Sequence, residues 1–272
     1  MAGAGVQLRE ERVMESKRSD LIVVADTDAL AQTAAKRISA RLKQRSGRLA
    51  VCLTGGSTPE RLYAVLATEL YRNALPWERI HWFWGDDRFV PYNDPRSNFG
   101  AARRLLLNHV PVPSGNIHAI PTGAGDVDEA ALLYEVDLRN FYGAESLAPG
   151  RPLFDVVLMG LGLDGHTASL FPGSQKLEKK KRWVVGVPEA GFEPFVPRVT
   201  LTFPTLASTR EMLFLVSGSG KREVLTRVLA GADVPAAQAY AEGELVWLVD
   251  RDAAPEPHDA APSLPSPARG GG

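Results

Sequence analysis

The stretch FDVVLMGLGLDGHTASLFP, residues 154–172, joins an apolar run to a glycine-rich polar segment. The run FDVVLM (154–159) is typical of a buried strand, because it is short and apolar at consecutive positions. His166 follows it, between Asp164 and a small hydroxyl-bearing segment. In open α/β sheets, ligands bind just outside the carboxyl ends of the strands. We therefore expect the chemistry of this protein where this strand ends.

Strand-like and helix-like patterns alternate along the rest of the chain. Segments that follow Asp26 and Ser57 repeat apolar residues at helical spacing, and residues 128–142 and 219–230 also indicate helices. Several strand-like runs are apolar on both faces, as in a parallel sheet covered by helices. We predict an α/β fold with a mostly parallel, Rossmann-like sheet and helices on both of its faces. The further predicted strands are 21–25, 48–54, 80–85, 183–187, 198–202, 211–218 and 244–250.

The length of 272 residues suits one large α/β domain, and no internal repeat or interior linker divides it. We expect residues 19–252 to form a single catalytic domain. Residues 1–18 are expected to be a flexible N-terminal segment. Residues 253–272, rich in Pro, Ala and Gly, are expected to be a disordered tail.

The charge balance argues against a nucleic-acid or membrane partner. The chain has 31 Lys and Arg against 32 Asp and Glu, a net charge of −1. The basic run at 178–182 is interpreted as a solvated loop. The single cysteine, Cys52, cannot form an internal disulfide, no run approaches the ~20 apolar residues of a membrane span, and no secretory signal is visible. We expect a cytoplasmic protein that is a monomer or weak homo-oligomer.

The segment TGGSTPERLY (54–63) follows a predicted strand and opens a predicted helix. Gly55 and Gly56 permit a tight turn, and Ser57 and Thr58 add hydroxyl groups. The helix N-terminus supplies free N–H groups and a partial positive charge, so the segment can cradle a phosphate. The alternative is a helix start without a ligand, closed by a capping box that begins at Ser57.

The segment WFWGDDRFVPYNDPRSNFG (82–100) is polar after an aromatic strand. Arg88 stands where this strand should end, and its planar guanidinium can pair with a substrate phosphate or carboxylate. The alternative is a surface ion pair between Arg88 and the two aspartates before it. Ser97 and Asn98 indicate the start of the next helix, with Ser97 or Asn98 as its cap.

The spacing of Gly160, Gly162 and Gly165 matches G-x-G-x-x-G, which suggests a dinucleotide site and a nicotinamide-dependent dehydrogenase. Three features weigh against this interpretation. Asp164 would place a carboxylate against the pyrophosphate, the following helix is cut short at Pro172, and the unit begins in the middle of the chain.

The other interpretation makes His166 an acid–base group. An unperturbed imidazole has a pKa near ~6.5, which suits proton transfer at neutral pH, and Asp164 can orient the ring or raise its basicity. The alternative is a hydrogen-bonded histidine at a helix start. No pair of histidines shows metal-ligand spacing, so no metal site is expected.

Two cationic residues lie next to predicted strands in the C-terminal half of the chain. Lys221 comes after a Gly-Ser-Gly turn at a helix start, and Arg198 opens a strand. A phosphate could reach the Lys221 ammonium group and free N–H groups together. For each residue the alternative is a solvated surface charge.

Taken together, these blocks resemble the 6-phosphogluconolactonase family, which is related to glucosamine-6-phosphate deaminases and ribose-5-phosphate isomerases. The resemblance spans roughly residues 20 to 252. Its blocks are LTGGSTPERLY, WGDDRFVPYNDPRSNFG, MGLGLDGHTASLFPGS, RVTLTFPTL and SGSGKREVL, and the third is the most specific. The resemblance implies the fold of the glucosamine-6-phosphate isomerase/deaminase group.

The resemblance also implies an activity, the hydrolysis of 6-phospho-D-glucono-1,5-lactone to 6-phosphogluconate in the oxidative pentose phosphate pathway. It makes His166 the general base that activates water and Asp164 its neighbour in the motif. Arg88 would bind the phosphate or stabilise developing charge. The resemblance implies no metal and no cofactor. The residues it assigns to the 6-phosphate are Gly55, Gly56, Ser57, Thr58, Arg198 and Lys221.

The chain departs from the family pattern at three places. The usual Asp-Glu-Arg is Asp86-Asp87-Arg88, Leu163 stands where proline is frequent, and the stretch GFEPFVP before Arg198 lacks a lysine often found there. Two rival functions stay open. A sugar-phosphate isomerase or deaminase of the same superfamily would need a further carboxylate base, and a non-catalytic sugar-phosphate sensor would usually carry a DNA-binding segment.

Overall fold

A six-stranded parallel sheet forms the centre of the computed structural model, which describes residues 19–174 and 181–256. The strand order is β1-β9-β8-β5-β2-β3, and every pairing is parallel. β2, β5 and β8 are buried at every residue, which explains their unbroken apolar sequences. The predicted parallel α/β sheet is confirmed. Its strands are β1 (Ser19–Val24), β2 (Leu49–Leu53), β3 (Ile80–Trp84), β5 (Val156–Met159), β8 (Glu211–Val216) and β9 (Glu244–Asp250).

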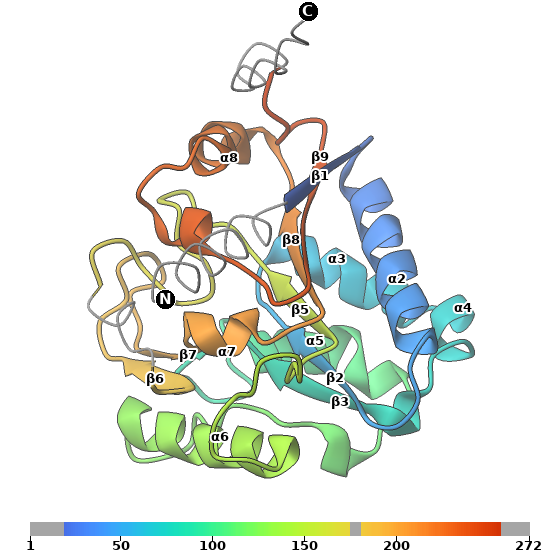
Figure 1. Cartoon of the computed structure of the whole chain (residues 1–272), viewed down its shortest axis with the longest axis vertical. Helices are drawn as coiled ribbons and strands as arrows, with labels where there is room; N and C mark the ends of the chain where they lie inside the picture. The colour runs from blue at the N-terminus through green and yellow to red at the C-terminus, as the bar shows by residue number, and fades with distance from the viewer. Residues whose placement is uncertain (1–18, 175–180, 257–272) are drawn as a thin grey trace, which may run out of the picture.

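Helices lie on both sides of this sheet, as Figure 1 shows, with α2 and α3 on one side and α7 and α8 on the other. The carboxylate of Asp26 caps α2 by accepting a hydrogen bond from the backbone N–H of Ala29. The α-helices are α2 (Thr27–Lys43), α3 (Ser57–Leu66), α4 (Glu69–Arg72), α5 (Asn98–Leu105), α6 (Val127–Tyr142), α7 (Phe203–Ala207) and α8 (Arg222–Leu229). Short 3₁₀ turns are η1 (Trp77–Arg79), η2 (Leu107–His109), η3 (Ser114–Asn116), η5 (Ser219–Lys221) and η6 (Pro235–Gln238).

A second, antiparallel sheet has the order β4-β7-β6 and comprises β4 (Asp86–Arg88), β6 (Val184–Val187) and β7 (Arg198–Leu201). The sequence predicts β6 and β7 as strands but not the sheet that they join. Both are buried at every residue. β6 (VVGV) shows no alternation of polar and apolar side chains, whereas β7 (RVTL) alternates strictly, as antiparallel strands often do. The strand β4 is missing from the prediction because it has three charged residues and no apolar one.

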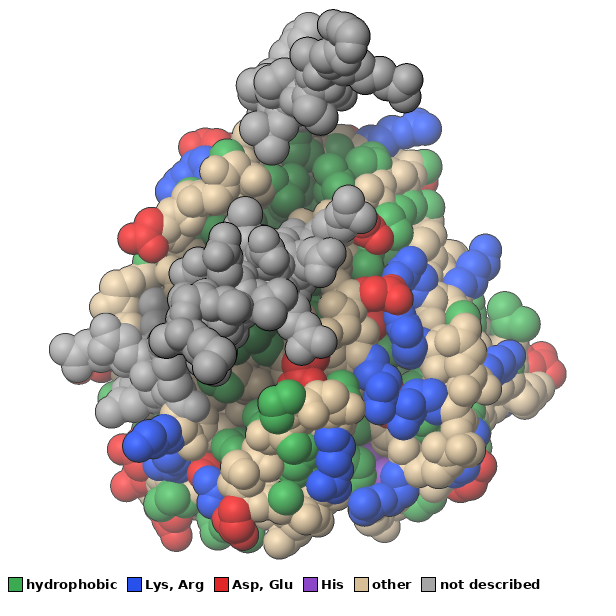
Figure 2. All heavy atoms as spheres, viewed as in Figure 1, with side chains coloured by type: hydrophobic (Ala, Val, Ile, Leu, Met, Phe, Trp, Pro, Cys, Tyr) green, Lys and Arg blue, Asp and Glu red, His purple; other side chains and the backbone are tan. Residues whose placement is uncertain are grey.

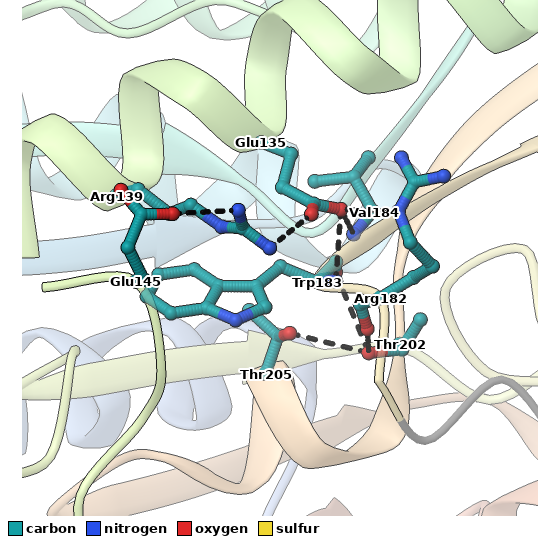
Figure 3. A network of polar contacts seen from close by, with 8 residues as sticks. All are labelled: Glu135, Arg139, Glu145, Arg182, Trp183, Val184, Thr202 and Thr205. Atoms are coloured by element: carbon teal, nitrogen blue, oxygen red, sulfur yellow. Dashed lines mark hydrogen bonds and ion pairs between the residues drawn. The ribbon is translucent and has the colours of Figure 1, made fainter.

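A buried carboxylate ties this second sheet to α6, as Figure 3 shows. Glu135 of α6 accepts hydrogen bonds from the side chains of Arg139 and Arg182 and from the backbone N–H groups of Trp183 and Val184, at 2.6–3.2 Å. Its side chain is 6% exposed. Four donors offset the desolvation of this charge, so Glu135 fixes the start of β6 on the helix.

A group of ion pairs, called the Arg37–Arg41 ladder below, lies at the amino ends of two strands of the parallel sheet. Figure 2 shows Lys and Arg side chains gathered on the side of this face where α2 lies. Arg37 and Arg41 both pair with Glu211, at the first residue of β8, and with Glu244, at the first residue of β9. Glu211 is 2% exposed, so the ladder anchors α2 to the amino ends of two central strands.

Three predictions concern residues that the structure does not describe, which are 1–18, 175–180 and 257–272. The predicted N-terminal segment, residues 1–18, lies entirely outside the described residues, as does most of the basic run at 178–182. Of the predicted tail, residues 253–256 are described. Ala253 is fully buried, and its backbone N–H donates a hydrogen bond to the carboxylate of Asp250. Among the described residues, no helix is both long and apolar enough to cross a membrane.

Candidate active site

A cavity of about 280 Å³ opens at the carboxyl ends of the parallel strands. The segments that follow β2, β5 and β8 form one part of its wall, and β4 and β7 of the second sheet form the other. Asp164 is not one of the residues that line the cavity, but it contacts His166, which does. The other predicted site residues all line the cavity: Gly55, Gly56, Ser57, Thr58, Arg88, His166, Arg198 and Lys221.

His166 and Asp164 form a tight pair. Nδ1 of His166 lies 2.5 Å from a carboxylate oxygen of Asp164, and the same oxygen accepts the backbone N–H of His166 at 3.0 Å. Because Asp164 occupies Nδ1, the other ring nitrogen, Nε2, is the one left for chemistry. Burial lowers the pKa of His166, while the charge and hydrogen bond of Asp164 oppose that shift. The imidazole is therefore neutral at pH 7 and able to accept a proton.

Two glycines are required in the loop that contains His166, residues 160–174, which we call the histidine loop. A Cβ atom on Gly162 would lie 2.1 Å from Nδ1 of His166. Gly165 has φ +88°, and a Cβ there would lie 2.7 Å from the side chain of Val234. Gly162 thus allows the close approach of the His166 ring, and Gly165 allows that of the segment containing Val234.

The dinucleotide interpretation of these glycines is contradicted by the backbone. Residues 160–174 contain turns and an isolated bridge between Thr167 and Leu170 but no helix. A dinucleotide fingerprint needs a helix N-terminus against the pyrophosphate. His166 also stands in this loop, so the alternative of a histidine at a helix start is wrong as well.

The glycine turn after β2 leads directly into α3, as predicted. Its cap differs from the prediction, because the N-cap residue is Gly56 (φ +112°) and no side chain accepts a hydrogen bond from the first turn. The predicted capping box at Ser57 is therefore wrong. The first N–H groups of α3 keep no side-chain cap, and the hydroxyl of Thr58 contacts that of Ser217 at 2.7 Å. An uncapped helix start beside a cavity suits an anion.

Arg88 and Arg198 face each other across the β4–β7 pairing. Nη1 of Arg88 donates to the carbonyl of Arg96 at 2.7 Å, and Nη2 of Arg198 donates to the carbonyls of Phe192 and Pro194 at 2.8 and 3.0 Å. The buried Nε atoms of both arginines have no hydrogen-bond partner among the described residues. Arg198 is 2% exposed, so its interpretation as a solvated charge is wrong. The guanidinium of Arg88 donates to the Arg96 carbonyl, and it is the backbone N–H of Arg88 that donates to the Asp87 carboxylate. The predicted alternative of a surface ion pair between Arg88 and its neighbouring aspartates is therefore wrong.

Lys221 lies on the opposite wall, at the last residue of η5. Its Nζ donates to the carbonyl of Leu161 at 2.6 Å, and burial lowers its pKa, although the charge of Asp164 partly opposes the shift. This lysine is therefore also not a solvated surface charge. Three cations surround the cavity, and among the described residues no group of three or more His, Cys, Asp or Glu could hold a metal ion.

Asp86 and Asn98 also line the cavity but were not predicted as site residues. Asp86 is 4% exposed and accepts the Ser169 hydroxyl at 2.6 Å. The side chain of Asn98 donates to the Asp86 carbonyl at 2.9 Å, and it fills the space that a Cβ on Gly55 would need. Alternation along β4 is the signal that could have identified Asp86, because residues two apart on a strand share a face.

Asp87 points to the other face of β4 and holds the start of α5. Its carboxylate accepts hydrogen bonds from the backbone N–H groups of Asn98 and Phe99 and from the Ser97 hydroxyl. Burial raises the pKa of Asp87 to about 6, although these donors oppose the shift. Ser97 caps α5 through the N–H of Gly100, as the sequence predicts. Asp87 therefore sets the position of Asn98 in the cavity wall.

Comparison with known proteins places this site in a family. A family model described as glucosamine-6-phosphate isomerases/6-phosphogluconolactonase matches residues 25–247. The chain belongs to this family. The match includes every residue of the cavity wall described above.

Individual relatives agree with the family assignment. The 6-phosphogluconolactonase of Synechocystis is 42% identical over 221 residues, covering 80% of this chain and 88% of that protein. That of Mycobacterium tuberculosis is 40% identical over 249 residues, covering 87% and 97%. The crystal structure of the Thermotoga maritima 6-phosphogluconolactonase superimposes with a TM-score of 0.75 at 30% identity, covering 86% of this chain and 100% of that one. A monomeric glucosamine-6-phosphate deaminase shares the fold, with a TM-score of 0.71 at 22% identity.

Proposed function

We propose that the protein hydrolyses 6-phospho-D-glucono-1,5-lactone to 6-phosphogluconate, the lactonase step of the oxidative pentose phosphate pathway. The observation that carries this proposal is the pairing of His166 with Asp164 beside a cavity lined by three cations. The family membership and the curated relatives at about 40% identity support the same reaction.

The proposed chemistry begins with a water molecule held by Nε2 of His166. The imidazole takes a proton from this water while the oxygen attacks C1 of the lactone, and the carbonyl electrons move onto the carbonyl oxygen. Arg88, whose buried Nε has no partner, is proposed to stabilise this oxyanion. The bond between C1 and the ring oxygen then breaks, and His166 returns the proton to the ring oxygen. Acid–base catalysis of this kind contributes ~10²- to 10⁴-fold.

The 6-phosphate is proposed to bind where the free N–H groups and cations meet. The turn from Gly55 to Thr58 supplies the uncapped start of α3, and Lys221 and Arg198 supply positive charge. Binding energy from this remote group would position the lactone ring for attack.

We further propose one catalytic domain over residues 19–252, working in the cytoplasm as a monomer or weak homo-oligomer. One hydrophobic cluster that extends from Leu30 to Ala253 supports the single domain. A buried free thiol at Cys52 is compatible with a reducing compartment. Size-exclusion chromatography of the purified protein tests the assembly state.

The decisive experiment generates the lactone in situ with glucose-6-phosphate dehydrogenase and follows its disappearance with added protein. The protein should accelerate hydrolysis well above the spontaneous rate, and His166→Ala should reduce turnover to that rate. Substrate binding by the variant should stay near normal. Ammonia release from glucosamine-6-phosphate, with no lactone hydrolysis, would instead favour the deaminase function.

A further inference from the structure

Two phenylalanine rings enclose the imidazole of His166. The ring centroid of Phe171 lies 4.9 Å from that of His166, and the ring centroid of Phe192 lies 5.4 Å from it. Phe171 belongs to the histidine loop and is 4% exposed. Phe192 comes from the segment between β6 and β7 and lines the cavity. The general base is therefore in contact with a residue from a different part of the fold.

Arg198 connects these two rings. Its guanidinium carbon lies 5.1 Å from the ring centroid of Phe171, in cation–π contact. Its Nη2 donates to the backbone carbonyls of Phe192 and Pro194, at 2.8 and 3.0 Å. The two bonds fix the backbone that carries Phe192. A Cβ on Gly191 would lie 3.1 Å from the side chain of Phe171, so the two segments are in close contact.

We propose that Phe192 is a positioning residue for the lactone hydrolysis: with Phe171, it holds the imidazole of His166 against Asp164 and keeps solvent away from the ring. The catalytic part of this inference rests on the proposed function. The enclosure of the ring does not, because it can be measured without any substrate.

The pKa of His166 makes the enclosure measurable. Charged groups from three parts of the fold influence this pKa. Asp164 in the histidine loop and Asp86 in β4 raise the pKa of His166, whereas Arg198 in β7 lowers it. The largest influence is burial, which lowers it. The phenyl rings supply part of that burial. Removing one ring admits water, and the pKa of His166 should then rise toward the ordinary histidine value.

The test is an NMR titration of the His166 ring in the full-length protein without substrate, with the His166→Gln variant used to assign the signal. Phe192→Ala should move the titration midpoint upward. Phe195→Ala is the matched control, because Phe195 lies in the same segment, is 71% exposed and does not line the cavity. Its midpoint should equal that of the wild type. Phe192→Tyr keeps the ring and should restore the wild-type midpoint.

Kinetics supply the second measurement. Phe192→Ala should lower kcat/KM roughly 10- to 100-fold, because a misplaced catalytic group loses rate steeply with distance. The acid limb of its pH profile should move in the same direction as the NMR midpoint. An unchanged midpoint in Phe192→Ala would overturn the inference, even in an active enzyme. If Phe192→Ala shifts the midpoint upward but the wild type has no lactonase activity, the enclosure is supported and only the proposed function is rejected. Should Phe192→Ala fail to fold, the titration of Phe192→Leu decides by the same criterion.

Discussion

The contact between Nδ1 of His166 and the Asp164 carboxylate, at 2.5 Å, determines which ring nitrogen can act as a base. The carboxylate accepts a hydrogen bond from the protonated Nδ1, so the neutral ring carries its free electron pair at Nε2. An asparagine at position 164 could present its amide N–H to the ring instead and favour the other tautomer. We therefore propose that Asp164 sets the tautomer of His166 as well as its orientation.

The first prediction concerns this tautomer. Asp164→Asn should lower kcat by about 10²-fold or more, within the range that general base catalysis contributes. The KM for the phosphorylated lactone should change little, because Asp164 does not line the cavity. Steady-state kinetics with lactone generated in situ would measure both constants. With an unphosphorylated lactone, Asp164→Asn should show the same loss of kcat. A rise in KM with an unchanged kcat would contradict the prediction and assign Asp164 to substrate binding.

The second prediction concerns the glycine beneath the ring. Gly162→Ala would bring a Cβ atom to within 2.1 Å of Nδ1 of His166, so the ring must move away from its productive position. We expect kcat to fall roughly 10- to 100-fold. Gly115→Ala is the control, since a Cβ there meets no atom within 4 Å and the glycine lies far from the cavity wall in sequence. Equal turnover in the two variants would remove the steric argument.

At the scale of elements, the parallel strands could be predicted because each is an apolar run followed by a polar turn. The second sheet could not, because β6 is as apolar as the parallel strands, and the polar–apolar alternation of β7 does not identify the strands with which it pairs. The same limit applies to the site. His166 and Lys221 were identified from the turns they follow, whereas Asp86 and Phe192 reach the cavity only through the pairing of β4 with β7 and the loop before β7.

The third prediction belongs to the junction of α6 and β6 in Figure 3. Glu135→Gln removes the charge that accepts four hydrogen bonds, and we expect the free energy of unfolding to fall by about 2–3 kcal/mol. The KM should rise as well, because the loosened sheet carries Arg88 and Arg198. Urea denaturation and steady-state kinetics measure the two effects.

Glu145→Gln provides the matched control for that junction. Glu145 pairs with the same Arg139 but its side chain is 87% exposed, so its loss should cost less than about 1 kcal/mol. If both glutamine variants lose the same stability, the buried carboxylate is not what anchors the second sheet.

At the scale of the whole molecule, chemistry and stability are placed at different ends of the sheet. The cavity lies at the carboxyl ends of the strands, and the Arg37–Arg41 ladder lies at the amino ends of β8 and β9. A histidine pair lies at the edge of the sheet, with His81 in strand β3 and His118 in the segment after η3. His81 contacts His118 at 2.9 Å, and His118 contacts Asp137 of α6. This pair could not be predicted from the sequence, because residues 81 and 118 are brought together only by the fold.

The last prediction uses this pair to separate folding from catalysis. Burial, with help from His118 and Arg48, lowers the pKa of His81 to about 4 from an ordinary 6.5, while Asp137 opposes the shift. Between those values the unfolded chain binds a proton that the folded chain does not, so the free energy of unfolding falls as pH falls from 6.5 to 4. His166 acts in the same direction, and Asp87, whose pKa is raised, acts in the opposite one. The His81 contribution must therefore be isolated by a variant.

Urea denaturation of the wild type and of His81→Gln at pH 7 and pH 5 isolates it. Asp87 and His166 are common to both proteins and cancel in the comparison. The wild type should lose about 1 kcal/mol more than the variant between the two pH values, once the shift is roughly halved for solvent screening of a partly exposed ring. His109→Gln, which alters an exposed histidine, should lose as much as the wild type. If His81→Gln also matches the wild type, the edge pair does not govern acid stability, and the opposed titrations of His166 and Asp87 are left to determine it.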